Sequence, residues 1–438
     1  MIGEMRSINK FSALRGKLFI AVISLIPFSQ STSASPWLEA NDSTLKGHLQ
    51  VLVDSGILTA STNTYPIRWT LLSKELSTVN INTLSAMQQL SFRYLKHSYD
   101  AQRVGRGLYG GRLSWNSQER SHIGFGDKNS RFKWNSEFQT ESNGKYSAYR
   151  INTGYGESWS DGESQFHMEN SFFVLGDGIW QFSLSQLDKW WGNGWANSVS
   201  WSQASTPLKT LNAGYIIETT ALNDIWIETN VSELEQPYGA DYLWSSRMAT
   251  KAQFVEIGLS AQYAFDGDDD FQTNNSTSGV FFDKDLRQTL DLKFSLPTMF
   301  GIYSSVYGSY SQHNSQAHDN SEVILYGADA QWLVLETSLR WYVETLDWQQ
   351  QAEVEYSNAV NTADPDNLSF GVIATLPNDH TIQLSYRDFS HYKEQLSKQA
   401  TYVSYSLAAL SGLTEVGAAY ESSQQSEFSV NVSWMFRF

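Results

Sequence analysis

The chain has no cysteine, only 8 prolines and few charged side chains. Without cysteine it can form no disulfide scaffold, thiol nucleophile or Cys-ligated metal site. Charged residues make up 17% of the 438 positions, below the roughly 25% of an ordinary soluble domain. No segment of the mature sequence has the ~18 uninterrupted apolar residues of a transmembrane helix. These shortages argue against a helical membrane protein.

Aromatic side chains, by contrast, are abundant. The chain contains 23 Phe, 22 Tyr and 16 Trp, yet its mean hydropathy is only −0.37. So many aromatics with so little charge also argue against intrinsic disorder. The net charge of −16 and the isoelectric point near 4.9 oppose nucleic-acid binding, so we expect no nucleic-acid partner.

The first 34 residues have the order of a secretory signal peptide. Basic side chains between Arg6 and Lys17 precede an apolar run from Leu18 to Phe28, and small or polar residues follow as far as Ala34. The alternative is an N-terminal membrane anchor, but the run is too short to span a bilayer as a helix. We therefore expect residues 1–34 to be removed after export through the general secretory pathway.

Residues 35–103 read as a small helical unit. Asp42 or Ser43 can cap a first helix, and Gly56 stands where a C-terminal cap belongs. The apolar face of this helix is formed by Leu45, Leu49 and Leu52. Further amphipathic segments follow up to residue 103. Helices this short need another surface to cover them, so we expect a plug at the periplasmic mouth of a larger body.

Residues 104–438 follow a period of two. Segments of about 8–13 residues alternate between apolar and polar positions and are separated by Gly, Asn, Asp and Pro turns. This pattern predicts an all-β fold, a closed transmembrane antiparallel β-barrel. Hydrocarbon cannot satisfy backbone hydrogen bonds, so a sheet that spans a membrane must close on itself. We count about 19 segments. An even number is required if both ends of the barrel face the periplasm, so 18 strands are predicted, with 16 as the alternative.

The last strand indicates the compartment. Its apolar side chains alternate without a break, and they form an expected outer-membrane insertion signal: Phe428, Val430, Val432, Trp434, Phe436 and Phe438. A strand of a soluble barrel is the alternative interpretation. With the signal peptide and the aromatic excess, the pattern favours the outer-membrane lipid bilayer of a Gram-negative bacterium. The barrel-assembly machinery is then an expected partner during biogenesis.

One predicted outside loop, residues 188–210, is rich in tryptophan. Trp faces can stack on sugar rings, while Lys and Asn can hydrogen-bond hydroxyl or acidic groups. The candidate polysaccharide-binding residues are Lys189, Trp190, Trp191, Asn193, Trp195 and Trp201. Gly192 and Gly194 would let the backbone bend sharply and approach a ligand. The alternative is that these Trp residues form an interfacial girdle or an internal plug.

Two stretches of the sequence resemble the Wzi-type capsule-assembly outer-membrane lectins. One stretch runs from Asn41 to Tyr65-Pro66, and the other is the Trp-Trp-Gly-Asn-Gly-Trp element at 190–195. The resemblance implies an 18-stranded barrel, a helical bundle at the periplasmic mouth and extracellular loops folded over the other mouth. It also implies attachment of polysaccharide without catalysis. The chain departs from the family pattern at Asn193, where proline is expected.

Other candidate sites are weaker. Glu141-Ser142-Asn143-Gly144 lacks the upstream His that a phospholipase-like serine needs, because position 140 is Thr. The acidic stretch 266–270 could hold Ca²⁺, but it has no EF-hand spacing and reads better as a solvated loop. The His residues show no metal-ligand spacing. We therefore expect no catalytic residues, no metal and no cofactor.

The favoured function is that of a non-enzymatic lectin, a monomer that binds and attaches or organises capsular or exopolysaccharide at the cell surface. The alternative is an outer-membrane porin or transport channel for sugars. A helical plug over 35–103 would block diffusion, which disfavours the porin. An outer-membrane hydrolase is a third possibility, and the sequence offers no complete triad for it.

Overall fold

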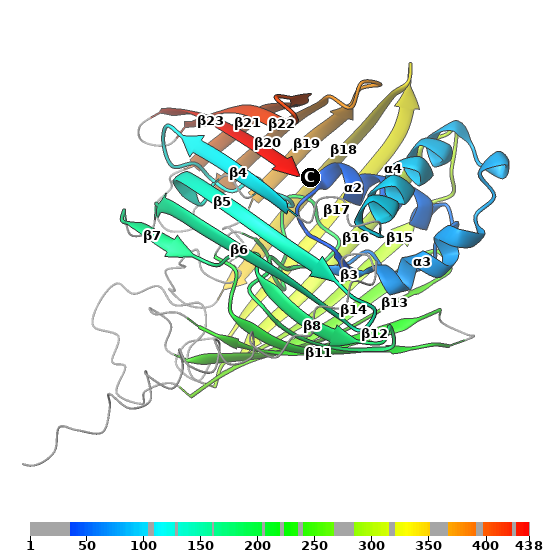
Figure 1. The fold of residues 1–438 in the computed structure, drawn as a ribbon, viewed down its shortest axis with the longest axis horizontal. Helices are drawn as coiled ribbons and strands as arrows, with labels where there is room; N and C mark the ends of the chain where they lie inside the picture. Colours follow the sequence, from blue (N-terminus) through cyan, green and yellow to red (C-terminus); the bar gives the residue numbers. More distant parts are fainter. Residues whose placement is uncertain are drawn as a thin grey trace, which may run out of the picture.

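The computed structural model describes residues 36–103, 109–127, 130–159, 162–203, 206–219, 223–234, 240–266, 284–314, 320–350, 367–390, 397–422 and 426–437. Within these ranges the chain forms a closed antiparallel β-barrel with an N-terminal group of helices at one mouth (Figure 1). The expected signal peptide, residues 1–34, lies outside the described residues.

The first part of the barrel wall contains β4 Tyr109–Asn116, β5 Phe132–Asn143, β6 Ser147–Ser158, β7 Ser164–His167, β8 Phe172–Gly176 and β9 Trp180–Ser185. The wall continues with β11 Thr210–Ile217, β12 Ile225–Glu233, β13 Tyr242–Ala252, β14 Val255–Phe265, β15 Leu286–Ser295, β16 Tyr303–Asn314 and β17 Ser321–Val334. It ends with β18 Thr337–Gln350, β19 Asn367–Thr375, β20 Thr381–Ser390, β21 Ser397–Ala409, β22 Gly412–Ser422 and β23 Glu427–Arg437.

The predicted strand number is confirmed. Both β7 and β8 pair with β6, along successive parts of its length, so together they make one interrupted strand of the wall. β23 pairs with β4 and closes the sheet. The barrel therefore has 18 antiparallel strands, and closing the sheet on itself lets neighbouring strands satisfy one another's backbone hydrogen bonds.

Alternation along the strands separates a polar lumen from an apolar outer wall. In β23, Ser429, Asn431 and Ser433 are buried on the inner side, while Phe428 and Val432 are exposed on the outer side. The expected outward positions Val430, Trp434 and Phe436 share that outer side and are partly exposed. Phe438 lies outside the described residues. An outer wall of this kind suits contact with lipid.

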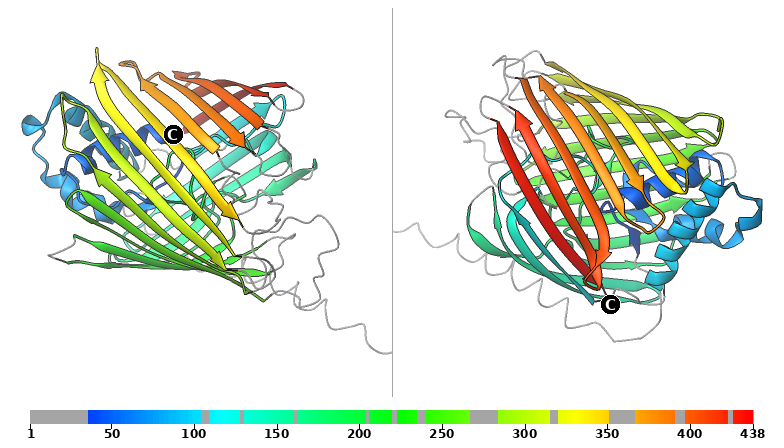
Figure 2. Two further views of the ribbon diagram at one scale, coloured as in Figure 1. Left: turned by 180° about the vertical axis from the view of Figure 1, so that it is seen from behind. Right: turned by 90° about the horizontal axis from the view of Figure 1, so that it is seen from above.

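The two ends of the barrel differ. All the helices gather at one mouth, where the C-terminal strand also ends (Figures 1 and 2). We name this mouth the helix end and the opposite mouth the loop end. Hairpin turns at the helix end are short, as between Val334 and Thr337, whereas residues 186–209 make a long connection at the loop end. Short turns on one side and long loops on the other are typical of outer-membrane barrels.

The first helix, α2 (Ser43–Asp54), begins and ends where expected. The Asp42 carboxylate accepts a hydrogen bond from the Leu45 N–H at 2.8 Å, and Gly56 follows the helix with a φ of +74°. The helix is buried on more than its Leu face, however, because Lys46 and His48 are also buried. This differs from an ordinary amphipathic helix, and the reason is that the Trp-rich connection 186–209 covers Lys46 while α4 covers His48.

The remaining N-terminal elements cover the helix end. They are β1 Trp37–Leu38, β2 Thr64–Tyr65, β3 Ile67–Arg68, α3 Trp69–Thr78, the 3₁₀ helix η1 Ile81–Thr83 and α4 Ala86–Arg103. α4 packs against both α2 and α3 (Figure 1). Ser85, just before α4, shares a 2.7 Å hydrogen bond with the hydroxyl of Tyr303 on the barrel wall. No helix in the described ranges is both long and apolar enough to cross a bilayer.

Candidate functional site

The tryptophan-rich connection between β9 and β11, residues 186–209, is here called the Trp loop. It leaves the wall at the loop end and folds into the lumen. Its short strand β10 (Trp190–Trp191) pairs with β2 of the N-terminal region, so that Trp190 lies opposite Tyr65 and Trp191 opposite Thr64. Both tryptophans are fully buried. The N-terminal region and the Trp loop thus meet inside the barrel, one from each mouth.

The expected exposure of this loop is therefore wrong. Every candidate polysaccharide-binding side chain is buried in the lumen: Lys189, Trp190, Trp191, Asn193, Trp195 and Trp201. The physical reason is that large aromatic side chains gain more from the enclosed interior than from water at a loop tip. The alternative placement as an internal plug matches the observed position. A direct contact between these side chains and polysaccharide stays a prediction, and it requires the loop to leave the lumen.

Trp190 and Trp195 surround the ammonium group of Lys46 from α2. The Lys46 Nζ lies 4.2 Å from the Phe125 ring centroid, 4.5 Å from that of Trp195 and 5.4 Å from that of Trp190. It also donates a 2.7 Å hydrogen bond to the carbonyl of Gly194. Burial lowers the pKa of Lys46, and the nearby charges of Glu344 and Asp329 oppose that shift. The ring faces and the carbonyl also favour the ammonium. This cage joins the helix to the Trp loop.

Trp191 and Trp201 form a second aromatic pair, with ring centroids 5.1 Å apart. The backbone N–H of Trp191 donates a hydrogen bond to the backbone carbonyl of Trp201 at 2.9 Å. The ammonium of Lys189 lies over both rings, at 5.5 and 5.3 Å, and donates a 2.6 Å hydrogen bond to Asn230 Oδ1 on the barrel wall. Lys189 therefore ties the loop to the wall, a role that differs from the ligand contact expected of it.

Glu344, on the wall strand β18, holds the tip of the Trp loop. Its carboxylate accepts hydrogen bonds from three successive backbone N–H groups, those of Trp195, Ala196 and Asn197. The hydroxyl of Tyr307 donates to the same carboxylate at 2.8 Å. Hydrogen bonds to a charged acceptor are about twice as strong as neutral ones, so this residue is a principal anchor of the loop. Sequence reasoning did not single it out.

The two predicted turn glycines do bend the backbone. Gly192 has a φ of +137°, and its N–H donates to the Asn63 carbonyl at 2.8 Å. A Cβ at Gly194 would collide with the Asn197 carbonyl oxygen. The glycines thus permit a close approach, but to the N-terminal segment and to the loop itself. Between them, the carboxamide of Asn193 is buried and has no hydrogen-bond partner within the described ranges.

Charged residues of the lumen wall hold the N-terminal segment. Arg247 pairs with Asp291 at 2.7 Å and donates to the Asn63 carbonyl at 2.8 Å. Arg340 pairs with Asp329 at 2.6 Å and donates to the Gly47 carbonyl of α2 at 3.1 Å. Each arginine thus meets one wall carboxylate and one plug carbonyl. Isolated charges at lumen-facing positions of predicted strands were the available sequence signal for these contacts.

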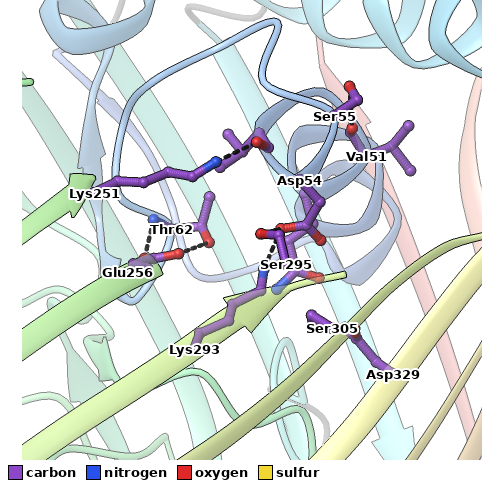
Figure 3. Close-up of polar contacts among 12 residues, drawn as sticks. Val51, Asp54, Ser55, Thr62, Lys251, Glu256, Lys293, Ser295, Ser305 and Asp329 are labelled. Atoms are coloured by element: carbon purple, nitrogen blue, oxygen red, sulfur yellow. Dashed lines mark hydrogen bonds and ion pairs between the residues drawn. The ribbon is translucent and has the colours of Figure 1, made fainter. Parts of the chain in front are cut away.

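The C-terminal end of α2 receives two lysines from the wall (Figure 3). Lys251 donates to the carbonyl of Val53, and the Lys293 ammonium lies 2.8 Å from the Asp54 carboxylate. Cations at this end of a helix also complement its dipole. Nearby, Glu256 accepts hydrogen bonds from the N–H and the hydroxyl of Thr62. The plug is therefore attached to the wall mainly through polar contacts.

The arrangement fills the lumen and occupies its charged groups in structural contacts. Within the described ranges, no group of three His, Asp or Glu side chains is placed to hold a metal ion. Residues 267–270 of the acidic stretch considered for Ca²⁺ lie outside those ranges. The geometry supports a barrel whose lumen is plugged, with partners reaching it from outside the lumen.

Comparison with known proteins gives a fold match at low sequence identity. No protein-family model matches the chain, and no curated protein sequence matches it. The solved structure of Wzi from Escherichia coli, described as an outer membrane protein involved in group 1 capsule assembly and a carbohydrate-binding β-barrel, superposes with a TM-score of 0.76. The match covers 92% of this chain and 99% of Wzi at 14% identity.

OpdK from Pseudomonas aeruginosa, solved with vanillate, gives a TM-score of 0.49 at 8% identity. That match covers 75% of this chain and 97% of OpdK. The resemblance to Wzi-type proteins predicted from residues 41–66 and 190–195 is confirmed at the level of the fold. This chain has the fold of the Wzi outer-membrane β-barrel, with its own Trp loop folded into the lumen.

Proposed function

We propose that this protein is a non-enzymatic outer-membrane protein that binds capsular or exopolysaccharide and attaches or organises it at the cell surface. The observation that carries the proposal is the plugged lumen. The N-terminal region enters from the helix end and the Trp loop from the loop end, and they meet at the β2–β10 pair and at the hydrogen bond from Lys46 of α2 to the Gly194 carbonyl. A barrel filled in this way suits binding at its loop end better than passage of solutes. The carbohydrate binding described for Wzi supports the same choice.

The orientation follows from the two mouths. The helix end, with its short turns, faces the periplasm, and the long connections of the loop end face outward. Residues 1–34 direct export through the general secretory pathway. The barrel-assembly machinery recognises the last strand, Phe428 to Phe438, and inserts the barrel into the outer membrane as a monomer.

Within this proposal the Trp loop acts on polysaccharide indirectly. Its buried rings fix the position of the backbone that returns to the loop end at Thr210, and so they set the shape of the outer surface. Replacing a buried Trp by Ala typically costs about 3–5 kcal/mol, a large share of what holds the loop beside the contacts of Glu344 and Lys189. Loss of Trp packing would then weaken attachment without any loss of a sugar contact.

The porin alternative requires an open path through the barrel. Arg247, Arg340 and Glu344 line the lumen, but each one is hydrogen-bonded to the plug or to the Trp loop. A channel for sugars would need these contacts to break during transport. Nothing in the described residues favours that over a permanently held plug.

The experiment is surface retention of polysaccharide in a strain that lacks the chromosomal gene. Cells complemented with the wild-type chain should keep their polymer, and cells without it should release the polymer into the medium. Trp195→Leu tests the loop, and Trp180→Leu on the exposed outer wall is the matched control. Equal retention with and without the protein, at normal barrel levels, would contradict the proposal.

A further inference from the structure

The hairpin turns at the helix end divide into two sectors. From β5 to β12 the turns carry exposed charged side chains, namely Lys145, Asp177, Glu218 and Asp224. From β13 to β22, four of five turns carry an exposed large apolar side chain at the tip. These are Phe254, Phe300, Leu335 and Leu410, which are 57%, 98%, 94% and 80% exposed. The fifth turn, residues 376–380, is polar. We call the β13–β22 half of the rim the apolar sector and the β5–β12 half the charged sector.

Backbone geometry does not account for these side chains. Phe300, Leu335 and Leu410 have φ values of +53°, +48° and +55°. This left-handed region favours Gly and Asn, and bulky side chains rarely adopt it. In the two-residue turns 335–336 and 410–411 the following residue, Glu336 or Ser411, also has a positive φ. The sector therefore carries apolar side chains where the turn itself would be easier with Asn or Gly, and something outside the turn must favour them.

The apolar tips continue the apolar outer wall. Below Phe300 on the outside lie Met299, Leu296 and Phe294, all exposed. Val334 precedes Leu335 on the same edge, and Leu413 follows Leu410. The surface that faces lipid along the strands thus extends over the rim at four of the five turns of this sector, with exposed Glu336 beside Leu335 and the polar turn 376–380 as the exceptions. The β5–β12 turns also expose apolar side chains, Tyr146 and Ile179, but each lies within two residues of an exposed charge, Lys145 or Asp177.

We propose that the apolar sector of the helix-end rim inserts into the interfacial region of the membrane leaflet at that end, while the charged sector stays in water, so that the barrel axis leans toward β13–β22. The occupant of the sector is phospholipid. Apolar side chains at such a boundary can enter the headgroup and acyl region by about 5–10 Å. Lys145 and Asp177 would oppose the same depth on the other side, because charge on a lipid-facing surface is unfavourable. This inference does not depend on polysaccharide binding.

The chain has no cysteine, which allows one spin label to be placed at a time. The variants are Leu335→Cys and Leu410→Cys in the apolar sector, with Lys145→Cys and Asp177→Cys as matched turn controls. The full-length protein is reconstituted into phosphatidylethanolamine–phosphatidylglycerol vesicles. Collision rates are then measured with oxygen, which concentrates in lipid, and with a water-soluble nickel chelate.

Labels in the apolar sector should collide several-fold more with oxygen than with nickel, and the control labels should show the reverse order. Equal nickel access at all four positions would overturn the proposal. Protection at 335 and 410 from both reagents would also overturn it, because a second copy of the chain rather than lipid would then cover the sector.

A second measurement keeps the barrel free of labels. Leu335→Asn combined with Leu410→Asn suits the left-handed backbone, so the turns should form at least as well as in the wild type. Polarised infrared dichroism of oriented bilayers should show a more upright barrel in this variant. An unchanged strand orientation in the folded variant would contradict the proposed lean.

Discussion

At the scale of single residues, the plug depends on a few buried polar groups. Glu344 collects three backbone N–H groups of the Trp loop, and Lys46 sits between the rings of Phe125 and Trp195. A buried polar group of this kind stabilises the fold only while its hydrogen-bond partners stay in place. A buried donor or acceptor without a partner costs about 1–3 kcal/mol. Substitutions here test the plug without touching the outer wall.

We predict that Glu344→Gln lowers the free energy of unfolding by about 1–3 kcal/mol, because a neutral amide replaces the carboxylate that accepts from Trp195, Ala196 and Asn197. The loop tip should become susceptible to protease. Urea titration in lipid vesicles and limited proteolysis measure the two effects. Glu336→Gln in an exposed turn is the matched control and should change neither.

His48 makes the helical region sensitive to acid. It lies in α2, within hydrogen-bond distance of Ser91 on α4 at 3.0 Å, and its ring is 4.6 Å from that of Tyr94. Burial, followed by the charge of Arg340, lowers the pKa of His48 from 6.5 to about 3. The unfolded chain therefore binds a proton at a pH where the native chain does not. The contribution of neutral His48 to the free energy of unfolding is therefore fully present above pH 6.5, and it is lost as the pH falls toward 3.

We predict that His48→Gln reduces the loss of stability between pH 6.5 and 3, by about 5 kcal/mol at the full shift. The measurement is the thermal midpoint of helical circular dichroism along a pH series. His97→Gln, on the exposed face of α4, is the control and should leave the acid sensitivity unchanged. Identical pH profiles for His48→Gln and the wild type would refute the assignment.

At the scale of elements, α2 is fastened by its C-terminal end. The pair between Lys293 and Asp54 is almost completely buried, and Ser295 also donates to Asp54 at 2.7 Å. Removal of one partner from a buried pair leaves an uncompensated charge, which typically costs 3–5 kcal/mol. An exposed pair such as Lys209–Glu233 contributes at most about 1 kcal/mol.

We predict that Lys293→Met releases α2 and lowers the stability of the helical region by about 3–5 kcal/mol, whereas Lys209→Met costs less than about 1 kcal/mol. Hydrogen exchange of the α2 amides in the two variants makes the comparison. Equal protection of α2 in both would show that the buried pair does not hold the helix. Adding Asp54→Leu to Lys293→Met should recover part of the loss.

Element identity was predictable because it depends on local pattern. The Asp42 cap, the Leu45–Leu49 face and the inward and outward alternation of β23 all follow from periodicity and were expected. The position of the Trp loop was not, because its route into the lumen depends on a cavity formed by strands far away in sequence. The indole N–H of Trp195, for example, donates to Asp329, and its backbone N–H donates to Glu344. No local sequence pattern connects these three residues.

At the scale of the whole molecule, two segments close the barrel from opposite mouths. The N-terminal region is attached through Arg247, Arg340 and Lys293, and the Trp loop through Glu344 and Lys189. The strand number and the closed sheet could be inferred from segment count and parity. The closure of the lumen by both segments together could be seen only in the assembled structure.

The central claim is that this barrel holds its ligand at a surface and does not conduct. Planar-bilayer recording of the purified full-length protein tests it most directly, with a variant in which residues 190–201 are replaced by a short Gly-Ser linker as the comparison. The wild type should show no steady conductance, and the variant should show openings as the Trp loop leaves the lumen. Large steady conductance from the wild-type protein would contradict the account.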